Sequence, residues 1–149
     1  MINKVKKKMT RSENMSKVKS KGNNYEIYLR KLLWKNGFRY RVNYTKLPGK
    51  PDIYIMKYKT AIFVNGCFWH MHNGCKLSTV PKSNYDFWNK KLKGNVIRDN
   101  LNYDLLKSLG INIIIVWGCE IKEMMKNSFI EKEKILSIKE ICLENCSKL

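Results

Sequence analysis

Residues 64–75, VNGCFWHMHNGC, decide the fold together with the run 60–64, TAIFV, that leads into them. This run is short, continuous and apolar, which is typical of a buried strand. The stretch after it contains both histidines of the chain and two of its five cysteines. Functional side chains are commonly carried on loops that a rigid element positions. We therefore expect a functional site at the end of this strand.

The composition predicts a single domain that binds a polyanion. The chain has 149 residues, of which 44% are hydrophobic, and its net charge is +18 at pH 7. That length fits one domain with a real core. An AT-rich genome explains why lysine is used more often than arginine, but not why basic residues greatly outnumber acidic ones. Nucleic acid is therefore the leading candidate for a binding partner. No apolar run is long enough for a bilayer and no signal core is visible, so we expect a cytoplasmic protein without a membrane partner.

Two segments differ in composition. Residues 1–21 are basic and poor in branched apolar side chains, so we expect an N-terminal arm that is loose in solution. The serine and threonine in residues 10–15 are typical caps of a short helix. Such an arm can become ordered on binding phosphates, but for an isolated basic tail we favour the simpler interpretation of a solvated tail. Residues 22–149 are expected to form a single domain.

The rest of the chain predicts an α/β fold. We expect helices at 24–36, 84–93, 96–109 and beyond 120, and strands at 38–44, 53–56, 60–64 and 111–117. A helix between the last two strands indicates a parallel crossover. The continuous apolar run of the last strand suits burial on both faces. Leu101, Leu105, Leu106 and Leu109 are expected to pack inward, and the helices after residue 120 to be peripheral.

The cysteines favour a metal site. An odd cysteine count without a secretion signal indicates metal binding rather than disulfides. Cys67, His72, Cys75 and Cys119 could supply the three thiolates and one imidazole typical of structural zinc. The spacing leaves His70 as an alternative to His72. Buried free cysteines are the other interpretation.

Asp52 introduces possible nuclease chemistry. Pro51-Asp52 before a strand is half of a signature of metal-dependent nucleases, but it also occurs in ordinary turns. The usual second half, an acid and a lysine two residues later on the next strand, is absent, because Ala61-Ile62-Phe63 stand there. Such a site would need another base. His70 is the nearest candidate, since a neutral imidazole takes a proton near pH 7.

Several motifs in one order resemble a known family, the Vsr-type DNA mismatch endonucleases of very short patch repair. The matching pieces are residues 9–15 (MTRSENM), 47–52 (LPGKPD), 66–70 (GCFWH), 87–88 (FW), Lys91, Asn95, 98–99 (RD) and 116–120 (VWGCE). They cover most of the chain, roughly residues 9 to 121. The combination is specific, although single pieces are not.

The resemblance implies a restriction-endonuclease-like mixed β-sheet flanked by helices, with a structural zinc site. It implies magnesium-dependent cutting of one strand 5′ to the thymine of a T:G mismatch, the product of 5-methylcytosine deamination. Asp52 and the Val64 main-chain carbonyl match the magnesium ligands, and His70 matches the residue that activates water. Glu26 matches a carboxylate that supports the hydrated metal. The zinc ligands match Cys67, His72, Cys75 and Cys119, which leaves His70 free for chemistry.

The same resemblance assigns DNA contacts and partners. Phe68, Trp69 and Trp88 match residues that push into the base stack beside a mismatch, which is cheaper to open than a normal pair. Met15 matches a residue that approaches from the opposite groove. Lys91, Asn95 and Arg98 are expected as further DNA contacts. We expect a monomer that acts with mismatch-repair proteins and a DNA polymerase, and a functional link to a cytosine-5 methyltransferase.

Two positions depart from the family pattern. Asn65 stands where a histidine is common, and we keep it as a catalytic candidate that assists the metal-bound waters. Gly118 stands where a glutamate is frequent. Two other classes remain open from the sequence: a restriction-type endonuclease that cuts paired DNA, and a non-catalytic, zinc-stabilised DNA-binding module.

Overall fold

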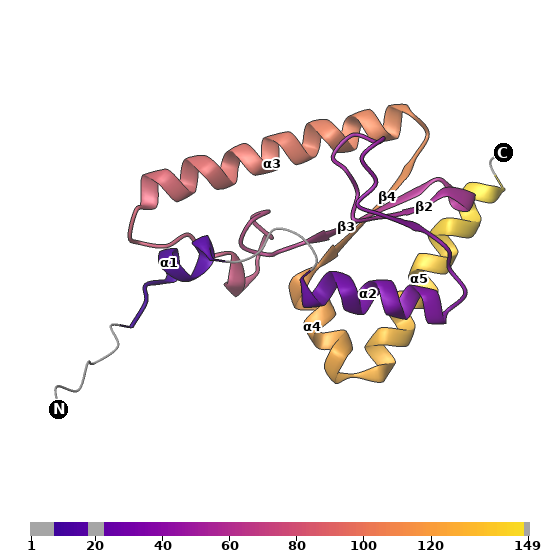
Figure 1. Ribbon diagram of the computed structural model, residues 1–149, viewed down its shortest axis with the longest axis horizontal. Coiled ribbons are helices and arrows are strands. Elements are labelled where there is room, and N and C mark those ends of the chain that lie inside the picture. The colour runs from indigo at the N-terminus through magenta and orange to yellow at the C-terminus, as the bar shows by residue number, and fades with distance from the viewer. Residues whose placement is uncertain (1–7, 18–22, 148–149) are drawn as a thin grey trace.

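The computed structural model describes residues 8–17 and 23–147 (Figure 1). Residues 1–7 and 18–21 of the expected arm lie outside the described part of the chain. The elements are α1 (Arg11–Ser16), α2 (Asn24–Lys35), β1 (Arg41–Val42), β2 (Ile53–Ile55), β3 (Thr60–Asn65), α3 (Tyr85–Ser108), β4 (Asn112–Trp117), α4 (Gly118–Lys126) and α5 (Ser128–Cys146), with 3-10 turns at Met56–Tyr58 and Lys76–Ser78. In that part of the chain no helix combines the length and the apolar character that crossing a membrane requires.

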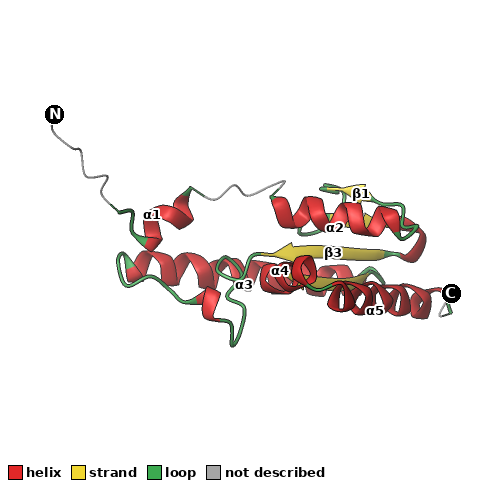
Figure 2. Cartoon of the chain, turned by 90° about the horizontal axis from the view of Figure 1, so that it is seen from below, coloured by secondary structure: helices red, strands yellow, loops and turns green. Residues whose placement is uncertain are grey.

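The sheet is mixed and flanked by helices, which confirms the expected α/β class. Its order is β1-β2-β3-β4. The first three strands pair antiparallel. β3 and β4 are parallel, in register from Thr60 opposite Asn112 to Asn65 opposite Trp117. The predicted crossover is therefore confirmed, and α3 is the helix that makes it (Figure 2).

Helices cover the two faces of the sheet unequally. α2, α4 and α5 lie on one face and α3 lies on the other (Figure 1). The first face holds the main core, which includes Leu33, Ile62 and Val116. The second core is smaller and centres on Phe63 and Leu106. β3 is buried at all six positions because it lies between both cores, which accounts for its unbroken apolar sequence.

α3 corrects two predictions. The helices expected at 84–93 and 96–109 are one helix of 24 residues, and Gly94 does not interrupt it. Leu101, Leu105 and Leu109 do not pack inward, since they are 61%, 54% and 59% exposed. Only Leu106 of the four leucines is buried, because α3 contacts the sheet along one narrow face and has no helix packed on its outer side in the described part of the chain.

Other elements also differ from their predicted form. The strand expected at 38–44 is paired only over Arg41–Val42, because the next residue, Asn43, has a positive φ of 45°. Along β4 the Ile114 and Val116 side chains are buried and their neighbours are partly exposed, so the strand is not buried on both faces. The C-terminal helices are not peripheral. α5 contributes three buried side chains to the main core: Ile135, Ile138 and Cys142.

Candidate active site and metal centre

Asp52 lies just before β2 and is held against the end of β3. The Val64 backbone N–H donates to Asp52 Oδ2 at 2.7 Å. Burial raises the pKa of Asp52 to about 6, which is the largest effect on it. The Val64 hydrogen bond lowers this pKa, the charge of Glu26 raises it, and the charges of Arg30 and His70 lower it. Glu26 and His70 therefore both act electrostatically on the Asp52 carboxylate.

Glu26 is a second carboxylate beside Asp52. It stands in the first turn of α2, where Asn23 caps the helix by accepting the Glu26 N–H at 3.0 Å. The residue is only 2% exposed, and Arg30 Nη2 lies 3.2 Å from Glu26 Oε2. A buried carboxylate and a half-buried carboxylate that repel one another favour binding of a cation. Carboxylate, carbonyl and water oxygens are the ligands that Mg²⁺ prefers, so Asp52, the Val64 carbonyl and Glu26 suit this ion.

His70 is oriented by α3. Its backbone N–H donates to the Gly66 carbonyl at 3.1 Å, in the turn that follows β3. Its ring Nδ1 makes a short contact with Asp99 Oδ2 on α3. A neutral ring that donates its Nδ1 proton to Asp99 keeps the Nε2 lone pair free to accept a proton. The pair therefore has the arrangement that a general base requires.

Asp99 received no role from the sequence. The sequence does contain a pattern that points to Asp99. Trp88, Leu92, Asn95 and Asp99 are spaced by four, three and four residues, so they share one face of α3. Trp88 and Leu92 are buried, so the same face turns Asp99 inward toward the loop after β3. Because Tyr85–Ser108 is a single helix, Asp99 lies beside the histidine loop.

The two positions that depart from the family pattern lie near each other. Asn65 is 4% exposed at the end of β3, and its Nδ2 donates to the Tyr103 hydroxyl at 3.0 Å. A Cβ added at Gly118 would lie 3.3 Å from the Tyr25 ring and 3.9 Å from the Asn65 carbonyl oxygen. A glutamate at 118 would therefore press on Tyr25. The Asn65 amide is engaged by Tyr103 from α3.

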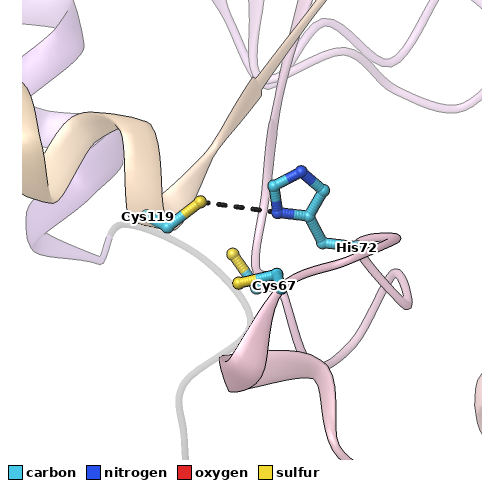
Figure 3. A group of neighbouring side chains, drawn as sticks. Cys67, His72 and Cys119 are labelled. Carbon is cyan, nitrogen blue, oxygen red and sulfur yellow. Dashed lines mark hydrogen bonds between the residues drawn. The ribbon is translucent and has the colours of Figure 1, made fainter.

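The structure brings together the four expected zinc-binding residues. One ligand atom from each of Cys67, His72, Cys75 and Cys119 lies within 4.8 Å of the other three. The first three come from the loop after β3, and Cys119 comes from the first turn of α4. Because β3 and β4 are parallel neighbours, their carboxyl ends meet at one edge of the sheet. Figure 3 shows Cys119 Sγ facing His72 Nδ1, 3.4 Å away. His70, the alternative ligand, instead contacts Asp99.

The chemistry of this Cys/His group fits a metal ion better than free thiols. Burial raises the pKa of Cys67 to about 12 and also raises that of Cys119. A backbone hydrogen bond from Leu77 lowers the pKa of Cys75. A divalent cation removes the thiol protons and offsets the cost of the buried thiolates. The His72 ring stacks on Trp117 at 4.1 Å between centroids, which fixes its plane.

The expected mismatch-opening aromatics form a cluster on α3. Phe68 is 4% exposed and Trp88 is 3% exposed, and both pack on Leu92. Trp69 is partly exposed and lies 5.2 Å from Phe68 and 5.7 Å from Trp88, between ring centroids. Lys91 Nζ lies 5.5 Å from the Trp69 ring centroid. Asn95 Nδ2 donates to the Trp69 carbonyl at 3.1 Å, and Arg98 Nη2 donates to Asn95 Oδ1 at 3.2 Å.

α1 covers this aromatic cluster. Thr10 and Glu13 form the reciprocal cap expected for residues 10–15, with Glu13 N–H to Thr10 Oγ1 at 3.2 Å. Trp88 Nε1 donates to Ser12 Oγ at 2.6 Å, and Met15 packs against the cluster. Phe68 and Trp88 are therefore not exposed in this state. Insertion of these rings between bases requires them to leave their contacts with α1.

Comparison with known proteins places the chain in a family. The family model for DNA mismatch endonuclease Vsr matches residues 3–76. The type II nicking enzyme V.NmeAIP of Neisseria meningitidis serogroup A is 46% identical over 84% of this chain and 86% of its own length. DNA mismatch endonuclease Vsr of Escherichia coli K12 is 39% identical over 77% of this chain and 73% of its own length. V.HpaIIP of Haemophilus parainfluenzae, another type II nicking enzyme, is 40% identical over 86% of each chain.

With these relatives, the fold and the site define the protein as a DNA endonuclease. More narrowly, the chain belongs to the Vsr family of DNA mismatch endonucleases. The family resemblance expected from the sequence motifs is thereby confirmed.

Proposed function

We propose that the enzyme is a magnesium-dependent endonuclease that cuts one DNA strand 5′ to the thymine of a T:G mismatch. Such mismatches arise when 5-methylcytosine deaminates, and the nick would start very short patch repair. The observation that carries the proposal is the meeting of Asp52, Glu26 and the His70–Asp99 pair at the end of β3, next to the aromatic cluster. This arrangement supplies a cation site, a base and stacking side chains in one place.

Each residue of the site has a defined task. Asp52 and the Val64 carbonyl would hold a magnesium ion, and Glu26 would bind its water shell. When bound, the ion stabilises the negative charge that develops on the scissile phosphate. His70 Nε2 accepts a proton from the attacking water while Asp99 holds Nδ1 and stabilises the imidazolium. Asn65 donates to the Tyr103 hydroxyl and keeps the end of β3 in place, where it would assist the waters of a bound ion.

The remaining residues support the site and hold the DNA. Cys67, His72, Cys75 and Cys119 would hold a zinc ion, which would tie the histidine loop to α4 and thereby support the position of His70. Phe68, Trp69 and Trp88 stack into the opened mismatch, and Met15 enters from the other groove. Lys91, Asn95 and Arg98 contact phosphates or base edges along α3. The net charge of +18 supports phosphate binding.

The cellular setting follows from this substrate. A mismatch that arises from methylated cytosine implies a cytosine-5 methyltransferase acting on the same DNA, and a nick with a free 3′ end implies a DNA polymerase. We place the enzyme in the cytoplasm as a monomer, in contact with mismatch-repair proteins. A T:G site has no two-fold symmetry, so it offers no second equivalent position for a partner subunit.

A nicking assay on matched duplexes tests the function. Two labelled duplexes that differ only in a single T:G or C:G pair are incubated with enzyme and magnesium, across all flanking base pairs. We expect a single nick 5′ to the thymine and little cutting of the paired duplex. Equal cutting of both duplexes would indicate a restriction-type endonuclease. Binding without any nicking, unchanged in Asp52→Ala, would indicate a non-catalytic module.

A further inference from the structure

α2 carries a cavity on the side of the sheet opposite to α3. Its volume is about 400 Å³, and it is lined by Ile27, Arg30, Lys31, Trp34, Lys35 and Tyr40. The first five residues recur at helical spacing and lie on one face of α2. Cavities of this volume accommodate small organic ligands. α2 and α3 lie on opposite faces of the sheet (Figure 1), so the cavity is separate from the aromatic cluster on α3.

The walls of the cavity offer a stacking surface. The Trp34 side chain is 54% exposed although it is large and apolar. Arg39 lies over its ring, 3.7 Å from the centroid, and Tyr40 meets it edge-on at 6.1 Å between centroids. The Tyr40 hydroxyl donates to the Arg30 carbonyl at 2.7 Å, which fastens this wall to α2. An exposed, braced indole suits stacking by a flat ring.

The same cavity offers cations for a phosphate. Arg30, Lys31 and Lys35 all line it. Arg30 uses Nη2 on Glu26, and its Nε is buried without a hydrogen-bond partner, the one such buried side-chain nitrogen or oxygen among residues 8–17 and 23–147. This nitrogen is buried, so a ligand in the cavity does not reach it, and the accessible cations of the lining are the exposed Lys31 and Lys35. An anion bound here would meet the exposed ammonium groups of Lys31 and Lys35.

We propose that this cavity binds a nucleotide, with the base stacked on Trp34 and the phosphate held by Lys31 and Lys35. The ligand must combine an aromatic ring with an anionic group. An apolar ligand would use only the Trp34 ring, and a bare phosphate would use only the basic side chains. The nucleotide can belong to an unpaired stretch of DNA or be free in solution. Of the residues that line the cavity, Arg30 also contacts the nicking site, through its ion pair with Glu26. Trp34, Lys31 and Lys35 have no task there, so the binding proposed here is separate from nicking.

The test compares two single-stranded probes of about eight nucleotides, oligothymidylate and an abasic strand with the same number of phosphates. Fluorescence anisotropy measures binding to the full-length protein and to Trp34→Ala. Phe129→Ala, which removes an exposed ring from α5, is the matched control. We expect wild type and Phe129→Ala to bind oligothymidylate about 5- to 100-fold more tightly than the abasic strand. Trp34→Ala should lose this difference and still nick a short T:G duplex at the wild-type rate.

Competition with thymidine monophosphate then identifies the source of the nucleotide. Displacement of the probe at equal phosphate concentration would assign the cavity to free nucleotides, and no displacement would assign it to unpaired DNA. Equal binding of both probes by the wild type, or a base preference that survives in Trp34→Ala, would overturn the proposal. The proposed nicking function would be unaffected by either result, because it is measured on the T:G duplex.

Discussion

Asp52 is a carboxylate whose ionised form is costly in the metal-free protein. Burial is the main reason that its pKa is about 6 instead of 3.8, and the nearby charge of Glu26 acts in the same direction. The folded protein therefore binds this proton more tightly than the unfolded chain does. Its contribution to stability is full below about pH 4 and is lost as the pH rises through about 6.

Asp52→Asn should therefore stabilise the metal-free enzyme at high pH only. We expect the free energy of unfolding to rise by about 1–3 kcal/mol near pH 8 and to change little near pH 4, because asparagine cannot ionise. Urea unfolding at both pH values, with a chelator present, measures the difference. Magnesium should then stabilise the wild type and not the variant. An equal effect of the substitution at both pH values would contradict the assigned pKa.

Asp99 is expected to matter for chemistry rather than for affinity. Asp99→Asn removes the charge that holds Nδ1 of His70, so the ring loses its preferred orientation and its stabilised imidazolium. We expect the nicking rate to fall about 100-fold with DNA binding largely retained. Asp104→Asn on the exposed side of α3 is the control and should nick normally. A normal rate in Asp99→Asn would exclude the pairing as functional.

At the residue scale, the sequence predicted groups that carry their own signal. Asp52 follows a proline and precedes a strand, and the cysteine spacing pointed to a metal set. Asp99 was assigned no role because its partner, His70, is 29 positions away in the chain, and only a single continuous α3 brings them together. The choice between His70 and His72 likewise depends on the orientation of each ring, which spacing alone does not encode.

At the element scale, the Cys/His group joins the loop after β3 to α4. Cys119→Ser should lose the bound zinc, because serine replaces a thiolate with a poor ligand for this ion. We expect the purified wild type to contain about one zinc ion per chain and the variant to contain much less. The free energy of unfolding of the variant should be lower by about 3 kcal/mol or more. Elemental analysis and thermal unfolding measure both quantities.

Cys146→Ser is the matched control for this prediction. Cys146 is an exposed thiol at the end of α5, outside the Cys/His group. It should keep the metal content and the unfolding temperature of the wild type. A Cys119→Ser protein with undiminished zinc, or an equal loss in both variants, would count against the proposed ligand set.

Elements buried on both sides were easier to predict than elements with one solvent-exposed face. β3 lies between two cores, so its unbroken apolar run was a reliable sign of a strand. β1 is exposed and is only two residues long, shorter than predicted, because Asn43 turns the chain with a positive φ. On α3 the apolar residues Ile97, Leu101 and Leu105 are exposed. A helix that covers a sheet alone does not have to bury all of its leucines.

At the scale of the whole molecule, distant segments meet around the site. β3, β4 and α3 converge there, and α1 from the N-terminal region lies against the aromatic cluster (Figure 2). The parallel crossover was predictable from the alternation of strand and helix. The contact of Ser12 with Trp88, 76 positions away, was not, since it depends on tertiary packing of a six-residue helix.

We propose that Asp52 and His70 form one nicking site at the end of β3. The most direct measurement is the single-turnover rate of nicking a T:G duplex by His70→Ala at saturating enzyme, with binding of the same duplex measured separately. We predict a rate about 10²–10⁴-fold below wild type with nearly unchanged affinity. A His70→Ala enzyme that binds and nicks this duplex at the wild-type rate would contradict it.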